Sequence, residues 1–354
     1  MNIKEKFGQM IMLGLDVDTI NDEIISLIKD YKIGGVVLYK KNYHDITSMK
    51  DLINKLKEIN TNNIPLFIAI DQENGRVNRL PNEIERIYSA EKQTRTNNIE
   101  IVNECNNITA EILNNIGINM NLAPVLDINY DNSKVIGNRS YGKNKEEVIK
   151  YAIPSIKTYQ SKGIIPVVKH FPGHGLANQD SHYLIPKIKN VSQMKEDLTI
   201  YKEAIKEECD AIMIGHLKVK GYGQEPASIN KRIIKKYLID KYNYQGIIIT
   251  DDLRMNIMQY VYGLKNIINK SINAGTNVLM IKYKPNDIKK LYNKLYKMID
   301  KGIINNNLIE DNYNTIIKIK EKYKLNNNII SNKLDIDSIN ERIKNVNKEI
   351  EKYL

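Results

Sequence analysis

Eight short apolar segments recur along the chain, and each is followed by a polar loop and then by a stretch with helical spacing. The segments are nearly continuous runs of aliphatic residues, which is typical of parallel strands buried on both faces. Eight such alternations predict a closed (β/α)₈ barrel of the TIM type, and a doubly wound open sheet is the alternative. The expected strands are residues 9–13, 34–39, 65–70, 118–123, 166–171, 211–215, 246–250 and 277–281; helical patterns include 48–58, 99–115, 146–161, 191–208 and 286–299.

The length of 354 residues is normal for one such barrel. No linker rich in Pro, Gly or Ser divides the chain, so we expect one catalytic barrel over residues 1–328. Residues 329–354 differ, because their apolar side chains fall at alternating three- and four-residue spacing: Ile336, Ile339, Ile343, Val346 and Ile350. This pattern predicts an amphipathic C-terminal helix, packed on the barrel or placed at a dimer seam. We therefore expect a monomer or a weak homodimer.

The net charge of +11 raises the question of nucleic-acid or membrane partners. The lysines are spread over helix faces and form no basic stripe interleaved with aromatic residues, so we expect neither partner. No apolar run approaches the roughly 18–20 residues of a membrane span. The first residues lack the apolar core of about 7–15 residues found in secretory signals, which predicts a cytoplasmic protein. Cys105 and Cys209 are too far apart to indicate a disulfide framework or a zinc site.

Polar and charged residues follow five of the expected strands directly. In a parallel barrel, the carboxyl ends of the strands meet at one face, where the active sites of this fold lie. Four of the five histidines fall in these segments, which favours a catalytic face over isolated structural histidines. The segments are DQENGRVNRL after residue 70, PVLDIN after residue 123, KHFPGHGLANQDSH from residue 169, His216, and DDLRM from residue 251.

Two pairs of residues indicate acid/base and nucleophilic chemistry. The loop pair Asp180 and His182 has a spacing that, in extended chain, puts both side chains on one side, so that the carboxylate can orient the imidazole and raise its basicity. A metal site is the alternative, although no HExxH spacing or third clustered carboxylate supports it. Asp251 and Asp252 end a strand and point oppositely, so one should face the barrel mouth as a nucleophile. Paired aspartates can equally bind Mg²⁺. These residues predict a hydrolase of a hydroxyl-rich substrate.

Several segments, in order, resemble the signature of glycoside hydrolase family 3, and most of all its single-domain β-N-acetylhexosaminidase branch. They are IGGVVLY, AIDQENGRVNRL, GNRSYG, KHFPGHGLANQDSH, EPASIN and GIIITDDLRM, and the resemblance runs from residue 9 to about residue 280. It implies Asp251 as nucleophile and His182 as acid/base residue, with Asp180 as its dyad partner. It also implies that no metal or organic cofactor is needed. The residues it implies for gripping the hydroxyls of the terminal sugar are Asp71, Arg79, Arg139, Lys169 and His170.

The resemblance implies a retaining exo-β-N-acetylglucosaminidase. Its expected substrates are amino-sugar oligosaccharides such as muropeptide or GlcNAc–MurNAc-type fragments, which places it in cell-wall recycling. Because an imidazole replaces a second carboxylate, phosphate can compete with water, so a GlcNAc phosphorylase is one alternative. The others are a β-glucosidase of the same family and a catalytically retired sugar-binding protein. The presence of Asp251, Asp180 and His182 argues against retirement.

The sequence departs from the family pattern at two places that bear on the site. Asn74 stands in DQENGRV where the family usually has Gly. Asparagine tolerates the left-handed conformation better than most residues, so we expect the turn to survive. Residues 218–224 replace a more usual aromatic-plus-acidic segment after His216, which leaves the leaving-group side of the pocket undefined.

Overall fold

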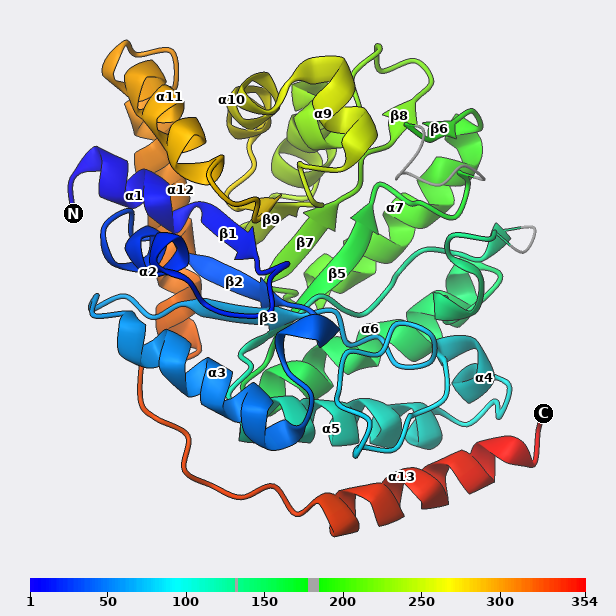
Figure 1. Ribbon diagram of the computed structural model, residues 1–354. Coiled ribbons are helices and arrows are strands. Elements are labelled where there is room, and N and C mark those ends of the chain that lie inside the picture. Colours follow the sequence, from blue (N-terminus) through cyan, green and yellow to red (C-terminus); the bar gives the residue numbers. More distant parts are fainter. Residues whose placement is uncertain (131–132, 178–184) are drawn as a thin grey trace.

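The computed structural model describes residues 1–130, 133–177 and 185–354, and its centre is one sheet of eight parallel strands (Figure 1). The sheet order is β10-β1-β2-β3-β4-β5-β7-β9. A bridge between Ile249 and Val278 joins β9 to the segment entering β10 and closes the sheet. The predicted (β/α)₈ barrel is confirmed, and the open-sheet alternative is wrong. The strands are β1 (Ile11–Gly14), β2 (Gly35–Leu38), β3 (Phe67–Ile70), β4 (Met120–Asn121), β5 (Ile165–Phe171), β7 (Ala211–Ile214), β9 (Ile247–Thr250) and β10 (Leu279–Lys282).

Helices alternate with the strands and surround the barrel (Figure 1). They are α1 (Ile3–Gln9), α2 (Asp22–Lys29), α3 (Ile46–Ile59), α4 (Ala90–Thr94), α5 (Ile99–Ile116), α6 (Lys145–Ser161), α7 (Val191–Lys206), α8 (Lys231–Ile233), the π-helical η5 (Ile234–Lys241), α9 (Asn256–Tyr262), α10 (Leu264–Ala274), α11 (Ile288–Asp300), α12 (Asn306–Lys322) and α13 (Ile336–Glu351), with 3₁₀ turns η1 (Lys40–Asn42), η3 (Gly137–Arg139) and η4 (Ala227–Ile229).

Asparagine and aspartate side chains fix where many of these helices begin. An amide or carboxylate oxygen accepts hydrogen bonds from the free N–H groups of the first turn, which stabilises a helix start by about 1 kcal/mol. The chain is rich in asparagine, and its helices use it in this way. The capping residues are Asn2, Asn21, Asp45, Asn98, Asn144, Asn190, Asn305 and Asp335.

The barrel strands are buried along their whole length, except for Lys282 at the end of β10. This explains why their sequences are nearly continuous apolar runs and not alternating patterns. A two-stranded ribbon lies outside the barrel, where β6 (Lys187–Ile188) pairs with β8 (Lys218–Val219). The sequence did not predict this ribbon, because two-residue strands carry no periodicity. Among the described residues, no helix combines the length and the apolar character needed to cross a membrane.

Helix α12 covers the amino-terminal end of the barrel and carries a buried lysine there. The Lys320 ammonium donates to Gln9 Oε1 and to the Gly34 carbonyl oxygen, each at 2.9 Å, and lies 4.5 Å from the centre of the Phe67 ring. These three residues stand just before or at the start of β1, β2 and β3. Burial disfavours the ammonium form, so the pKa of Lys320 lies well below its ordinary value of 10.5. Lys320 thus ties α12 to three strands at an electrostatic cost.

The C-terminal helix α13 lies along α5 (Figure 1). Its buried side chains are Ile339, Ile343, Val346 and Ile350. Arg342 fixes the helix to α5 with charge-assisted bonds of 2.8 Å to Glu104 Oε1 and 2.9 Å to Glu111 Oε2. The amphipathic pattern at the end of the sequence therefore corresponds to a helix seated on the barrel's outer layer.

The buried ammonium predicts a pH dependence of stability. Between the lowered pKa of Lys320 in the folded protein and about 10.4 in the unfolded chain, the unfolded chain binds more protons, so the free energy of unfolding rises with pH. Lys320→Met removes this dependence. In urea titrations at increasing pH up to about 10, the free energy of unfolding of wild type should rise relative to that of Lys320→Met, by at most about 1.4 kcal/mol per pH unit. Exposed Lys318 provides the control, and Lys318→Met should run parallel to wild type. If the free energy of unfolding of Lys320→Met changes with pH in the same way as that of wild type, the lowered pKa of Lys320 is not the cause of the dependence.

Candidate active site

The sequence-predicted residues that the structure describes lie at or near the carboxyl ends of barrel strands. Asp71 follows β3, Lys169 and His170 belong to β5, and Asp251 follows β9. Arg139 ends the 3₁₀ turn η3 in the connection between β4 and α6. These elements meet at one face because the strands are parallel and their carboxyl ends converge there.

Glu73 is the centre of a buried charge cluster made of Asp71, Glu73, Arg139 and Lys169. The Lys169 ammonium lies 2.7 Å from Asp71 Oδ1 and 2.5 Å from Glu73 Oε1. Arg139 binds Glu73 through two parallel bonds, Nε to Oε2 at 2.7 Å and a terminal nitrogen to Oε1 at 2.8 Å. The side chains of Lys169 and Glu73 are 2% and 4% exposed. The structure thus joins the predicted residues Lys169 and Arg139 through a carboxylate that was not predicted, and Lys169 in turn binds the predicted Asp71.

The charges of this cluster are mutually dependent. Burial opposes ionisation of Glu73, but Arg139 and Lys169 outweigh it and hold the pKa of this carboxyl far below its ordinary value of 4.5. Burial likewise disfavours the Lys169 ammonium, but Asp71 and Glu73 raise its pKa. Glu73, Arg139 and Lys169 are therefore all charged at neutral pH. The sequence signal for Glu73 was present in DQE, because residues i and i+2 of an extended chain face the same side.

The turn after Glu73 depends on Asn74. Its φ angle is 70°, in the left-handed region, so the turn keeps the conformation expected for the glycine of the family pattern. The side chain adds bonds that glycine cannot make. Its Oδ1 accepts from Gln72 Nε2 at 2.9 Å, and its Nδ2 donates to Thr109 Oγ1 at 3.1 Å. Asparagine therefore replaces glycine here and ties the turn to α5.

His170 is oriented by Asp127, a second residue that the sequence did not single out. His170 Nδ1 lies 2.6 Å from Asp127 Oδ2, and the backbone N–H of His174 donates to Asp127 Oδ1 at 2.7 Å. Asp127 is fully buried. Burial opposes its ionisation, but His170 and the His174 N–H lower the pKa of its carboxyl. With Nδ1 engaged, Nε2 of His170 is the ring atom left to meet a ligand. The signal was the carboxylate in PVLD, after the fourth strand.

His174 packs edge-on against His170, with ring centres 5.6 Å apart. Burial and the neighbouring His170 lower the pKa of His174 to about 4, so its ring is neutral at physiological pH. Its Nδ1 is buried and has no hydrogen-bond partner within residues 1–130, 133–177 and 185–354. The neutral ring therefore fills the space beside His170 without adding a positive charge.

Asp251 and Asp252 differ sharply in their surroundings. Asp252 Oδ1 accepts the backbone N–H groups of Arg254 and Lys282, each at 3.0 Å, so this carboxyl serves the barrel wall. Burial raises the pKa of Asp252. Burial also opposes ionisation of Asp251, but His216, His170, the Asp252 N–H and Lys169 lower the pKa of its carboxyl. Of the two, Asp251 is the carboxylate kept charged beside the cluster.

His216 supports the same strand end. Its Nε2 lies 3.0 Å from the Asp252 carbonyl oxygen, and its Nδ1 lies 2.6 Å from Ser228 Oγ. This pattern fits the tautomer in which Nε2 donates and Nδ1 accepts. The imidazole therefore fixes the backbone that directly follows Asp252.

The Arg79 side chain is not joined to this cluster in the described part of the chain. Arg79 forms no ion pair with the described residues, and its Nε is buried without a hydrogen-bond partner among them. Asp180 and His182 lie outside the described residues. In the described part of the chain, no three His, Cys, Asp or Glu side chains are grouped so that they could hold a metal ion.

Comparisons with known proteins agree with this geometry. The model of the glycosyl hydrolase family 3 N terminal domain matches residues 2–319. The chain is 33% identical over 264 residues to a beta-hexosaminidase of Photobacterium profundum, covering 74% of this chain and 78% of that protein. It is 32% identical over 275 residues to a beta-hexosaminidase of Tolumonas auensis, covering 76% and 81%. A glycoside hydrolase family 3 beta-N-acetylglucosaminidase from Paenibacillus sp. str. FPU-7 superposes with a TM-score of 0.92 at 27% identity, covering 99% of this chain and 69% of that chain.

The cluster predicts that Glu73→Gln is strongly destabilising, because it leaves two buried cations without their shared anion. The expected loss at neutral pH is about 3–5 kcal/mol of unfolding free energy in urea titrations. The pKa of Glu73 is lowered in the folded state, so its contribution is present above about 4.3 and is lost as the pH falls below that value. The gap between wild type and Glu73→Gln should therefore narrow in acid. Glu349→Gln, at an exposed pair with Lys352, is the control and should change stability far less.

Proposed function

The chain belongs to glycosyl hydrolase family 3, and from that premise we propose that this glycoside hydrolase is a retaining exo-β-N-acetylglucosaminidase. Relatives named beta-hexosaminidase and a family 3 beta-N-acetylglucosaminidase structure support an amino-sugar substrate. The observation that carries the proposal is the buried cluster around Glu73 beside the ionised Asp251. It offers fixed hydrogen-bonding charges for sugar hydroxyls next to a carboxylate able to attack.

Sugar hydroxyls are the proposed ligands of Asp71, Arg79, Arg139, Lys169 and His170. Among the described residues, Glu73 accepts two of the five N–H groups of Arg139 and the Val135 carbonyl oxygen accepts one, so these residues leave two for a ligand. Asp71 is held by Lys169 and can accept from hydroxyls. Charge-assisted hydrogen bonds of this kind are stronger than neutral ones, and their geometry is set before the sugar arrives.

Asp251 is the proposed nucleophile. Its carboxylate oxygen bonds to the anomeric carbon as the bond from that carbon to the leaving oxygen breaks, which forms a glycosyl ester. His182 gives its proton to the leaving oxygen in this step. In the second step, His182 takes a proton from water while the water oxygen displaces Asp251 from the same carbon. Two inversions give net retention. Asp180 is proposed to orient the His182 imidazole and to raise its basicity.

The proposed natural substrates are muropeptide or GlcNAc–MurNAc-type fragments, with a role in cell-wall recycling in the cytoplasm. We also propose that the protein acts as a monomer or weak homodimer and that it needs no metal or organic cofactor. An imidazole acid/base residue places less negative charge near the anomeric carbon than a second carboxylate does. Phosphate is therefore an acceptor to be tested beside water.

The function predicts turnover of an aryl β-N-acetylglucosaminide at a kcat/KM at least about tenfold above that of the matching β-glucoside. The reaction should give β-GlcNAc first, as observed by NMR. Asp251→Ala should lose nearly all activity, and Asp252→Asn should keep measurable turnover even if it is less stable. Faster cleavage of the β-glucoside would indicate a β-glucosidase. Formation of GlcNAc-1-phosphate in phosphate buffer would indicate a phosphorylase. Binding of the sugar without turnover would indicate a sugar-binding protein. An inverted product would refute the mechanism.

The covalent step predicts a trapped ester on Asp251. A fluorinated GlcNAc analogue slows hydrolysis of the ester, so the labelled enzyme should accumulate. Mass spectrometry of the peptide spanning residues 246–255 should place the sugar on Asp251. If the label is found on Asp252, that residue is the nucleophile and the proposed role of Asp251 is wrong.

The acid/base role of His182 predicts a dependence on the leaving group. His182→Ala should slow poor leaving groups by about 10²–10⁴ and activated aryl groups much less, because only the former need protonation. Asp180→Asn should give a milder form of the same dependence, since the imidazole is still present. Equal losses for both kinds of substrate would indicate a structural role.

A further inference from the structure

Two asparagines of α13 hold the backbone of residues 83–88, which belong to the loop between β3 and α4. Asn340 Oδ1 accepts from the Glu85 N–H at 2.8 Å, and its Nδ2 donates to the Glu83 carbonyl oxygen at 2.8 Å. Asn347 repeats the pattern on the next residues. Its Oδ1 accepts from the Tyr88 N–H at 3.2 Å, and its Nδ2 donates to the Arg86 carbonyl oxygen at 2.8 Å. Each amide thus bridges a backbone N–H and the carbonyl two residues before it.

The spacing of the two asparagines fits the helix. Seven residues are nearly two α-helical turns, so both side chains lie on one side of α13. Each directly follows a buried apolar residue, Ile339 or Val346. The bound segment presents its own apolar side chains inward, since Ile84 and Ile87 are 2% and 3% exposed. The two amides therefore fix the outer side of a segment whose inner side is part of the core.

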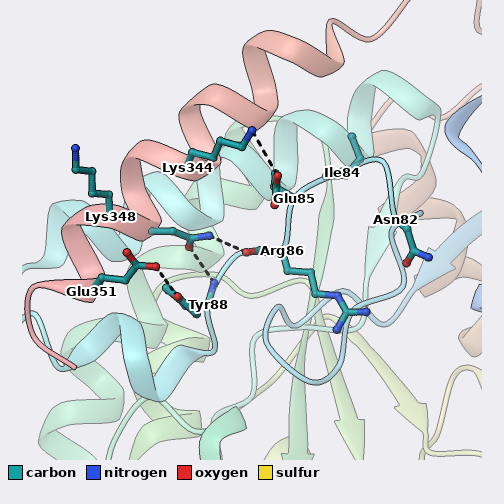
Figure 2. Close-up of a pocket in the computed structure, with 9 residues that line it drawn as sticks. Asn82, Ile84, Glu85, Arg86, Tyr88, Lys344, Lys348 and Glu351 are labelled. Carbon is teal, nitrogen blue, oxygen red and sulfur yellow. Dashed lines mark hydrogen bonds and ion pairs between the residues drawn. The ribbon is translucent and has the colours of Figure 1, made fainter.

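Other contacts between α13 and this segment are weaker (Figure 2). Lys344 lies 3.6 Å from Glu85, and the Tyr88 hydroxyl donates to Glu351 at 2.7 Å. Both involve exposed side chains, and such surface contacts contribute little. A groove of about 830 Å³ lies between the helix and the loop, with Arg86 and Lys348 among its lining residues. The asparagine amides are therefore the contacts that bind the loop's backbone to the helix.

The held segment supports the turn that carries Glu73. The Gly75 N–H donates to the Ile87 carbonyl oxygen at 3.0 Å, which joins the middle of the segment to this turn. A Cβ atom at Gly75 would lie 2.5 Å from the Ser89 Cβ, so the two strands of chain are in close contact. Within the turn, the Glu73 N–H donates to the Val77 carbonyl oxygen at 3.0 Å. A continuous path of hydrogen bonds and contacts runs from α13 to Glu73.

We propose that Asn340 and Asn347 are positioning residues for the glycosidase reaction. They hold residues 83–88, and through Ile87 they hold the turn that aims Glu73 at Lys169 and Arg139. The effect on catalysis rests on the proposed function, in which Lys169, Arg139 and Asp71 grip the sugar. The two asparagines lie beyond residues 2–319, which the family model matches, so this support comes from a part of the chain outside the family's catalytic signature.

The test compares Asn340→Ala/Asn347→Ala with Arg342→Ala. The control removes a side chain that lies between the two asparagines on α13 but anchors the helix to α5 and not to the loop. We expect the double variant to raise KM for an aryl β-N-acetylglucosaminide at least about fivefold, with kcat within about twofold of wild type. Hydrogen exchange of the backbone amides of residues 73–88, measured without substrate, should accelerate at least about tenfold. Arg342→Ala should change neither, and the amides of the barrel strands should be unaffected in both.

Three results would overturn the proposal. One is faster exchange at residues 83–88 alone, with residues 73–77 and KM unchanged, which would make α13 only a cover. Another is the same rise in KM in Arg342→Ala, which would reflect general loosening of the helix. A third is unchanged exchange in the double variant. If wild type does not cleave the substrate, the proposed function fails, and the exchange at residues 73–77 still decides whether the asparagines hold the turn. If the double variant folds poorly, Asn347→Ala alone can be tested instead. It should change KM and the exchange of residues 73–88 in the same direction by a smaller amount.

Discussion

The active face depends on one buried carboxylate, Glu73, placed between two cations. An ammonium and a guanidinium taken out of water are unstable unless an anion lies beside them, and Glu73 contacts both. In the proposed function the sugar presents uncharged polar groups, so the site needs donors and acceptors that are fixed in position and shielded from water. In this proposal Glu73 fixes Lys169 and Arg139 and does not bind the sugar itself, because its carboxylate is engaged by these two cations.

The same face shows how two identical side chains acquire different chemistry. Asp251 and Asp252 are neighbours in the chain, yet the pKa of one is lowered and that of the other is raised. The cause is what each carboxyl faces. Asp251 has His216, His170 and Lys169 around it, whereas the Asp252 carboxyl accepts the backbone N–H groups of Arg254 and of Lys282 in β10. Environments that separate two pKa values in this way are a common means of dividing roles between carboxyl groups.

The sequence predicted those parts of the molecule that leave a periodic or positional trace. Eight buried strands gave apolar runs, and the residues after them, such as Asp71 and Asp251, met at one face. Glu73 and Asp127 were missed because their importance comes from partners distant in sequence: Lys169 lies 96 positions after Glu73, and His170 lies 43 after Asp127. The carboxylates in DQE and PVLD stand after strands, but nothing in the local sequence names their partners. The strands β6 and β8 were missed because two residues are too few to show a periodic pattern.

The closure of the barrel also determines when it can form. Ile11 pairs with Leu279, 268 positions later, and Lys320 of α12 covers the amino-terminal end of the barrel. A chain emerging from the ribosome therefore makes β1 long before β10, the partner that covers its second edge, exists. Pairing across such a separation carries a large loop-closure entropy and slows folding. Until about 280 residues have been synthesised, the edge of β1 that pairs with β10 presents unpaired backbone N–H and C=O groups, to which another strand can pair.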